Sequence, residues 1–424
     1  MTTGQLRDWY QSHRTSCVIA AVVVCTLLGM ILRRPDQWAA PYVWIEEGTL
    51  MLPDFIRSGW ATVFHPVNGY FLVPTKIIHA LAATLSFRWL PEIDYWLTLS
   101  FTAGVLAAIA LAPTQLRYRV VCALAVLALP TDSEVFAMSA LAFWWGSLLV
   151  VLPLLWNPQG RQLPIVRILM LLVGGLSSPL VIILTPLYAV RAALVRTRFA
   201  WLDLGVAAFA AGVQYSVRPM TSGSTLATIA LIPKAMFVRK FFGYFIYVPA
   251  QYATHEGATL FAGVTLLLAL IFCAWRYRRD LNAAFYILFA ACLLAALASS
   301  IRQPLIQLHP ALAGPRYFFL PFAFLFWAVL QLFAVKAALP RIIAVATLAL
   351  VARNALDVGQ RDSDKFDWRA NVDACAAADQ HEFPIGYDGR AVAAWKVTLR
   401  GDDCRRLVAN SWFDNRPYAG GAAQ

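Results

Sequence analysis

The chain has 424 residues, of which 60% are hydrophobic and 14% are charged, and its formal net charge is +12. Soluble domains are nearer half apolar and a quarter charged, so this composition excludes a soluble globular protein and predicts a polytopic membrane protein. The basic residues gather in short stretches between apolar runs, as in cytoplasmic loops, so the positive charge does not predict nucleic-acid binding.

Apolar segments follow one another along most of the chain and predict an all-α fold with about 11 transmembrane helices. They lie at residues 16–32, 71–87, 95–112, 119–130, 137–155, 165–176, 179–190, 201–217, 257–275, 282–300, 315–334 and 340–352. The first follows basic residues in the manner of a signal peptide, but no small-residue cleavage site comes after it. We therefore expect an uncleaved first span.

The basic loops predict the orientation, because Lys and Arg favour the cytoplasmic side. An odd number of crossings must separate the first external stretch from the basic loop at Arg117, yet two apolar segments lie between them. Segment 71–87 carries Lys76 and His79 in its first half, so we expect it to lie flat on the membrane surface. The predicted organisation is a transmembrane domain at 1–352, external loops at 34–94 (with horizontal helices) and 218–256, and a small exported C-terminal cap at 353–424.

Two of the seven cysteines, Cys375 and Cys404, lie in the polar C-terminal segment, whereas the others lie in apolar runs. The predicted topology places this segment outside the cytoplasm, where thiols are oxidised. We therefore expect Cys375 and Cys404 to form a disulfide.

An acidic pair, Glu46 and Glu47, stands in the first external loop among aromatic and apolar residues. One of two adjacent carboxyl groups in such surroundings can have the raised pKa that a general base needs. The alternative is a solvated pair that caps a helix beginning near Thr49, where the helix dipole favours negative charge. The sequence alone leaves both interpretations open.

A second acidic site, Asp132 and Glu134, follows Pro130 in the next external loop. Two carboxylates at this spacing could orient an acceptor hydroxyl or bind a divalent cation. The alternative is a polar turn in which Asp132 is the N-cap of the helix that begins near residue 137.

Cationic side chains are expected on the external side, against the usual charge bias, and suggest an anionic partner. Arg316 and Tyr317 at the start of a span are the sharpest case, because a guanidinium can clasp a phosphate while the tyrosine anchors at the interface. Snorkelling of Arg316 to lipid headgroups is the alternative. Further candidates are Lys76, His79, Arg218, Lys234, Arg239, Lys240, Arg302 and His309.

The segment Trp44-Ile45-Glu46-Glu47-Gly48, followed by Gly69-Tyr70 and Pro74, resembles the GT-C superfamily of membrane glycosyltransferases. It is similar in particular to bacterial members that read W-x-E-D-G, including O-antigen-modifying glucosyltransferases that use polyprenyl-phosphate sugars. In this resemblance Glu47 stands at the family's Asp position, and Glu46 at the Glu before it. The longer side chain at position 47 leaves open which of the two is the base.

The resemblance implies an enzyme of the bacterial cytoplasmic (inner) membrane with its active site facing the periplasm. A polyprenyl-phosphate sugar would be the donor, held by Arg316 with help from the other cations, and a glycan or lipopolysaccharide the acceptor. The sequence leaves open whether a divalent cation, Mg²⁺ or Mn²⁺, takes part. Arg alone can neutralise a monophosphate leaving group, whereas Asp132 and Glu134 could hold a metal ion.

Two other classes of function fit the same topology. An O-antigen polymerase or ligase would depend on external Arg and His residues, here Arg218, Arg239, Arg302 and His309, and would not need Glu46 or Glu47. A flippase or transporter of lipid-linked sugars would place ionisable residues within its spans, and Asp203 is the nearest case.

Overall fold

The computed structural model describes residues 3–217, 232–248, 255–312, 314–358, 360–361, 366–385 and 396–414. Six of its helices are long and apolar enough to cross a membrane, which supports a membrane-embedded protein. They are Thr15–Arg33 within α1 (Thr3–Arg33), α5 (Leu90–Leu111), α15 (Glu256–Arg276), α16 (Ala283–Arg302), Arg316–Ala334, which joins α17 (Arg316–Gln331) to η9 (Leu332–Ala334), and α18 (Ala338–Val358).

Shorter helices complete the bundle and the segments at its ends. In the bundle they are α6 (Arg119–Ala125), η3 (Val126–Ala128), η5 (Ser139–Leu141), α7 (Ala142–Ser147), η6 (Leu148–Val150), α8 (Val151–Leu154), α9 (Pro164–Gly175), α10 (Leu180–Val195) and α11 (Arg198–Ser216). At one end they are α2 (Pro35–Ala39), η1 (Glu47–Met51), α3 (Leu52–Ser58), η2 (Gly59–Phe64), α4 (Val73–Leu85), η4 (Ser133–Val135), α13 (Lys234–Val238), η7 (Arg239–Gly243), α14 (Tyr244–Ile246) and η8 (Leu305–Gln307).

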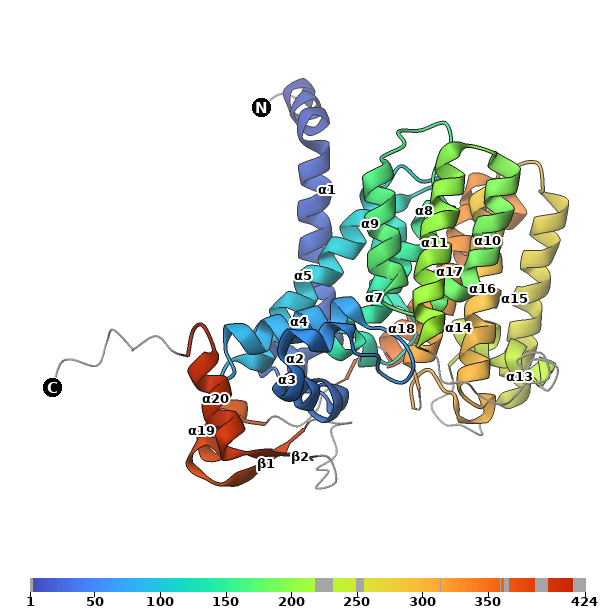
Figure 1. Cartoon of the computed structure of the whole chain (residues 1–424). Helices are drawn as coiled ribbons and strands as arrows, with labels where there is room; N and C mark the ends of the chain where they lie inside the picture. Colours follow the sequence, from blue (N-terminus) through green and yellow to red (C-terminus); the bar gives the residue numbers. More distant parts are fainter. Residues whose placement is uncertain are drawn as a thin grey trace.

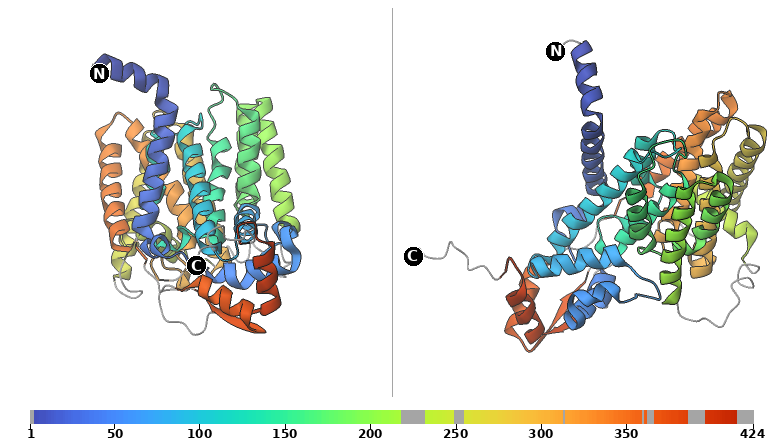
Figure 2. Two further views of the ribbon diagram at one scale, coloured as in Figure 1. Left: turned by 90° about the vertical axis from the view of Figure 1, so that its left-hand side faces the viewer. Right: turned by 45° about the horizontal axis from the view of Figure 1, so that its top comes forward.

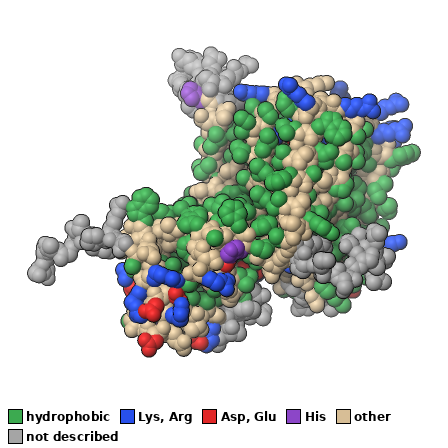
Figure 3. Space-filling model, viewed as in Figure 1, with side chains coloured by type: hydrophobic (Ala, Val, Ile, Leu, Met, Phe, Trp, Pro, Cys, Tyr) green, Lys and Arg blue, Asp and Glu red, His purple; other side chains and the backbone are tan. Residues whose placement is uncertain are grey.

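The bundle has two chemically different ends. The helices α9, α10, α11, α15 and α16 run side by side, and α4 lies across the lower end of the molecule on the side of α5 and α7, next to α2 and α3 (Figures 1 and 2). Hydrophobic side chains cover the flank of the bundle, and Lys and Arg line the rim opposite α4 (Figure 3). We call these the basic end and the α4 end.

Helix α4 differs in one respect from the amphipathic surface helix that the sequence predicts. Its polar residues Thr75, Lys76 and His79 are buried, and Ile77 is 40% exposed. The polar face therefore packs inward, because Lys76 and His79 find carboxylates there. The side chains of Lys76 and His79 therefore do not form the exposed polar face that an interfacial amphipathic helix would have.

Two predicted spans form shorter continuous helices, Arg119–Ala128 and Ser139–Leu154, in which α-helical and 3₁₀ turns follow one another. Segment 119–130 forms α6 and the turn η3, and segment 137–155 forms η5, α7, η6 and α8. The next difference is at the C-terminal boundary, where α18 continues to Val358 instead of ending at residue 352. The predicted loop 218–256 lies partly outside the described residues; its described part, 232–248, contains α13, η7 and α14.

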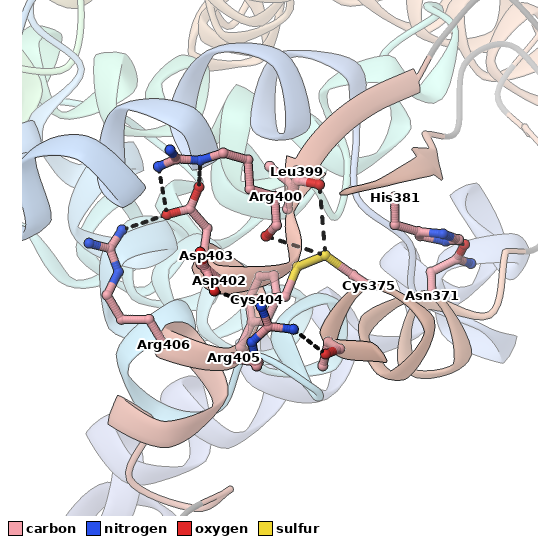
Figure 4. The surroundings of a disulfide bond; sticks show 12 residues. Asn371, Cys375, His381, Leu399, Arg400, Asp402, Asp403, Cys404, Arg405 and Arg406 are labelled. Atoms are coloured by element: carbon pink, nitrogen blue, oxygen red, sulfur yellow. Dashed lines mark hydrogen bonds and ion pairs between the residues drawn. A yellow bond between two sulfur atoms is a disulfide. The ribbon is translucent and has the colours of Figure 1, made fainter. Parts of the chain in front are cut away.

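The described part of the C-terminal segment folds into a small α/β cap. It consists of α19 (Trp368–Ala377), the antiparallel strands β1 (Gln380–Pro384) and β2 (Lys396–Arg400), and α20 (Gly401–Asn410). Cys375 in α19 and Cys404 in α20 form a disulfide with a Cα–Cα distance of 6.0 Å, next to ion pairs of Asp403 with Arg400 and Arg406 (Figure 4).

The cap is anchored to the α4 end. Trp368 Nε1 donates a hydrogen bond of 2.8 Å to the carbonyl of Phe87, and the two rings lie edge to face at 5.6 Å. Asp414 accepts hydrogen bonds from the backbone N–H of Phe87 at 2.8 Å and of Arg88 at 3.2 Å. The described part of the C-terminal segment therefore packs as one structural unit with the α4 end.

Candidate functional site

Arg316 joins the two acidic segments that the sequence singles out. Its Nη1 lies 2.9 Å from Glu46 Oε1 and 3.0 Å from Glu134 Oε1. Glu46 precedes η1, Glu134 lies in η4, and Arg316 begins α17 at the α4 end. Residues separated by up to 270 positions thus form one cluster.

The Glu46–Arg316–Glu134 cluster is partly open. The side chains of Glu46 and Arg316 are each 28% exposed, whereas that of Glu134 is 9% exposed. Glu46 Oε2 has no hydrogen-bond partner among the described residues. Burial raises the pKa of Glu134, and the charge of Arg316 opposes that shift.

Aromatic rings form one side of this neighbourhood. They follow one another from Tyr70 to Phe143, Trp144 and Tyr317, with centroid distances of 6.2, 5.1 and 6.0 Å. The guanidinium of Arg302 lies 5.8 Å from the Tyr70 ring, so a second cation approaches from α16. Tilted and edge-to-face aromatic rings beside cations suit a polar ligand with an apolar ring or chain face.

Asp132 contacts the backbone of Glu134 and the side chain of Arg361, and it does not pair with Arg316. Its Oδ1 accepts a hydrogen bond from the backbone N–H of Glu134 at 2.9 Å, as a helix N-cap does. Both of its oxygens also contact Arg361, at 3.0 and 3.2 Å, and Arg361 follows α18 near the start of the C-terminal segment. Asp132 is thus an N-cap, but of the short turn η4 and not, as the sequence suggested, of the helix that begins near residue 137.

Glu47 is buried in a different environment from Glu46, with 3% of its surface exposed. Its carboxylate accepts hydrogen bonds from Trp44 N at 2.7 Å, Ser139 Oγ at 2.8 Å and Ala140 N at 3.0 Å. Burial, followed by the charge of Asp94, raises the pKa of Glu47 to about 7. Glu47 thus ties the first external loop to η5.

Lys76 belongs to a separate buried ion pair. Its Nζ lies 2.7 Å from Asp54 Oδ2, which also accepts a hydrogen bond of 2.6 Å from Thr62 Oγ1. Burial alone would raise the pKa of Asp54, but the hydrogen bonds from Lys76, Thr62 and His65 outweigh it and lower that pKa. The Lys76 ammonium is thus engaged, and the structure gives no support to its predicted contact with phosphate.

The remaining predicted cations are spread over other elements. Arg239 pairs with Glu256, and Lys240 donates a hydrogen bond of 2.6 Å to the carbonyl of Leu308. His309 is buried against the ring of Tyr244, and Lys234 is exposed at the start of α13. Arg218 lies outside the described residues. Of this group, only Arg302 lies beside the ring chain that leads to Tyr317.

Metal binding gains no direct support from the described residues. None of them form a group of three or more His, Cys, Asp or Glu side chains that could hold an ion. Asp132 and Glu134 point to different arginines, Arg361 and Arg316. The structure therefore gives no support to their joint use as a cation site.

Three residues near the site are not predicted from the sequence. Ser139 and Asp94 contact each other beside Glu47, and Arg361 holds Asp132. Of the three, only Asp94 has a signal in the sequence, because a carboxylate at the start of an apolar span is unusual. Nothing in the local sequence marks Ser139 or Arg361, whose roles depend on which segments pack together.

Comparison of the chain with protein-family models, curated proteins and solved structures finds no match. Its function is therefore argued from the chemistry and geometry of the site.

Proposed function

We propose that this chain is a glycosyltransferase of the GT-C type with about 11 membrane crossings. In this proposal it transfers a sugar from a polyprenyl-phosphate donor to a glycan or lipid-linked acceptor. The reaction takes place at the α4 end, which faces the periplasm of a bacterial cell. The observation that carries the proposal is the meeting of Glu46, Arg316 and Glu134.

Arg316 is suited to the donor phosphate because its pairing leaves part of the guanidinium available. Both ion pairs use Nη1, and the described residues make no hydrogen bond to Nε or Nη2. A guanidinium carries five N–H donors in a planar fork that matches phosphate oxygens. Cationic neutralisation of the departing phosphate would stabilise the charge that develops in the transition state.

Glu46 is better placed than Glu47 to act as the general base. A base must reach the proton that it removes. The Glu46 side chain is 28% exposed, and its Oε2 atom, which is itself buried, has no hydrogen-bond partner among the described residues. Glu47 is buried and accepts three hydrogen bonds. We therefore assign the attack step to an acceptor hydroxyl that gives its proton to Glu46 as its oxygen bonds to the anomeric carbon and the C–O bond to phosphate breaks.

The orientation of the bundle supports a periplasmic site. Lys and Arg side chains line the rim opposite α4 (Figure 3), which is the distribution expected of a cytoplasmic face. The disulfide in the cap suits an oxidising compartment at the α4 end. The polymerase or ligase alternative has less support, because Arg239 and His309 are engaged elsewhere.

Glu46→Gln tests the proposal in purified protein reconstituted into nanodiscs. The assay follows release of polyprenyl phosphate from a panel of polyprenyl-phosphate hexoses in the presence of bacterial lipopolysaccharide. We expect transfer to fall by about 10²–10⁴-fold, as for loss of a general base, while binding of polyprenyl phosphate persists.

Lys396→Gln is the matched control, because Lys396 is an exposed cation of β2 in the cap, outside the Glu46–Arg316–Glu134 cluster. It should leave transfer unchanged. Full transfer by Glu46→Gln would sink the assignment of Glu46, and absence of transfer by the wild-type protein across the panel would remove the proposed function.

A further inference from the structure

Large aromatic side chains are exposed where the cap meets the start of α5. Trp412 and Phe413, which follow α20, are 63% and 52% exposed. Trp38 of α2, Trp89 just before α5 and Trp96 within α5 are exposed as well. Single exposed aromatic residues are ordinary, but a contiguous group of them indicates a surface that binds an apolar partner.

The backbone fixes Trp412 and Phe413 against the end of α4. Their N–H groups donate hydrogen bonds of 3.0 and 2.8 Å to the carbonyls of Thr84 and Leu85. The two rings stack with a centroid distance of 6.3 Å and an interplanar angle of 18°. The loop after α20 therefore presents the two rings as a fixed pair beside α4.

The other three rings lie at the start of α5, which begins five residues after α4 ends. Trp96 meets Trp38 edge to face at 5.8 Å, so α2 and α5 share an aromatic contact. Trp89 lies in the short connection between α4 and α5. All five rings thus border one junction, and we call Trp38, Trp89, Trp96, Trp412 and Phe413 the aromatic band.

Two arginines accompany the aromatic band. The guanidinium of Arg369 lies 3.9 Å from the centroid of the Trp89 ring, and Arg88 pairs with Asp373 of the cap at 2.8 Å. Both arginine side chains remain partly exposed. Indole rings with cations at their edge suit the headgroup layer of a bilayer, where the rings reach the hydrocarbon and the cations meet phosphate groups.

The aromatic band continues the hydrophobic surface of the bundle. Helix α5 is long and apolar enough to cross a membrane, so the hydrocarbon layer must begin along it. Trp89 and Trp96 lie at its start, where membrane-spanning helices often carry tryptophan at the interface. The pair Trp412 and Phe413 lies beside this boundary because of its hydrogen bonds to the end of α4.

The cap itself is aromatic on one side and charged on another. Exposed ionic side chains lie on its strands and at the start of α20, as in the Lys396–Glu382 pair and at Asp402. Figure 3 shows charged side chains on the part of the cap that lies away from the bundle, and hydrophobic ones nearer to it. This asymmetry is typical of a domain at a bilayer surface.

We propose that the cap docks on the bilayer at the α4 end and inserts Trp412 and Phe413 into its headgroup layer. The partner that covers the aromatic band is phospholipid, and Arg88 and Arg369 face its phosphate groups. The cap is then held in two ways, by its hydrogen bonds to the α4 end and by the bilayer itself. This inference does not depend on the proposed glycosyl transfer.

Photo-cross-linking tests the docking in the full-length chain. The photoreactive amino acid p-benzoylphenylalanine replaces Phe413, and the purified protein is irradiated in nanodiscs of dioleoylphosphatidylcholine and dioleoylphosphatidylglycerol. The replacement keeps an aromatic ring, and the hydrogen bond at this position comes from the backbone. We expect the intact mass to rise by that of one phospholipid.

The same amino acid in place of Asp402 is the matched control within the cap. Asp402 lies in the first turn of α20, whereas Trp412 lies beyond its last residue. A helix of ten residues is about 15 Å long, which exceeds the roughly 5–8 Å thickness of the headgroup layer in one leaflet. Position 402 should therefore give little or no lipid adduct, while position 96, in the span itself, should give a strong one.

The yields at the three positions decide the outcome. Lipid adducts at positions 413 and 96 but not at 402 support the docking of the cap. If position 413 gives no lipid adduct while position 96 does, or if positions 413 and 402 react equally with lipid, the docking is overturned. A cross-link from position 413 to a second copy of the chain also overturns it, because the band is then an interface between copies.

Discussion

Each end of the bundle holds an ion cluster: a carboxylate between two arginines at the basic end, and an arginine between two carboxylates at the α4 end. Only the second cluster is open. At the basic end, Asp203 of α11 contacts Arg167 of α9 at 2.9 Å and Arg191 of α10 at 3.2 Å. Asp203 and Arg167 are each only 1% exposed. At the α4 end, Arg316 and Glu46 are each 28% exposed, and parts of both side chains have no partner among the described residues.

This difference separates a structural ion cluster from a candidate site. The two arginines at the basic end are also held by backbone carbonyls, Arg167 by Phe199 at 3.2 Å and Arg191 by Trp156 at 3.1 Å. Such a cluster ties α9, α10 and α11 together and has little capacity left for a ligand. A buried ionisable residue thus does not indicate transport when its partners are fixed.

The largest effect is expected from opening the closed cluster. Asp203→Ala would leave Arg167 and Arg191 as buried cations without their carboxylate. Breaking a buried ion pair from one side costs about 3–5 kcal/mol. We expect a marked loss of thermal stability in detergent, measured by the unfolding midpoint of the purified protein.

The matched variant is Glu46→Ala at the open cluster, which should change the midpoint much less because exposed pairs contribute about 0–1 kcal/mol. Equal destabilisation at both ends would show that the two clusters do not differ as the exposure of their side chains implies.

The next effect is on catalysis. Arg316→Ala should lower transfer by about 10²–10³-fold, as for removal of a group that stabilises transition-state charge. Arg316→Lys should recover little, because an ammonium lacks the planar fork of donors. The measurement is kcat and KM with the donor that supports wild-type transfer.

Arg302→Ala separates the two cations that reach the aromatic side of the site. Its effect on kcat should be smaller, since Arg302 lies over Tyr70 and, within the part of the chain that the structure describes, makes no ion pair with the carboxylates of the cluster. A larger loss for Arg302→Ala than for Arg316→Ala would reverse the assignment of the phosphate ligand.

The smallest effect is the pH dependence of stability at the α4 end. The pKa of Glu47 rises from 4.5 to about 7 through burial and the neighbouring charge of Asp94. Between pH 4.5 and pH 7, Glu47 therefore binds more protons in the folded protein than in the unfolded chain. Its contribution to the free energy of unfolding is full below pH 4.5 and is lost as the pH rises to about 7. This contribution of Glu47 to the free energy of unfolding is at most about 3 kcal/mol.

Unfolding midpoints from pH 4.5 to pH 8 check this in the wild type and in Glu47→Gln. The wild-type curve should fall relative to that of the variant, which has no proton to lose at position 47. Parallel curves of unfolding midpoint against pH would contradict the raised pKa of Glu47. The Asp203 cluster is the same in both proteins and should contribute no difference between them.

The sequence by itself determined the membrane class, because apolar runs and few charges admit little else. It also identified Glu46, Glu134 and Arg316 as candidates, since charged residues at the ends of apolar spans are costly without a role. The disulfide partners followed from the only two cysteines in the polar C-terminal segment.

Only the tertiary structure decided which candidates act together. The local sequence around Lys76 and Arg316 shows a cation beside apolar residues in both cases, yet Lys76 is buried against Asp54 and Arg316 lies partly open between two carboxylates. Likewise, Glu46 and Glu47 are adjacent identical residues, and only the packing of η5 and α5 buries the second. Pairing and burial depend on contacts between distant segments, and such contacts leave no periodic trace in the sequence.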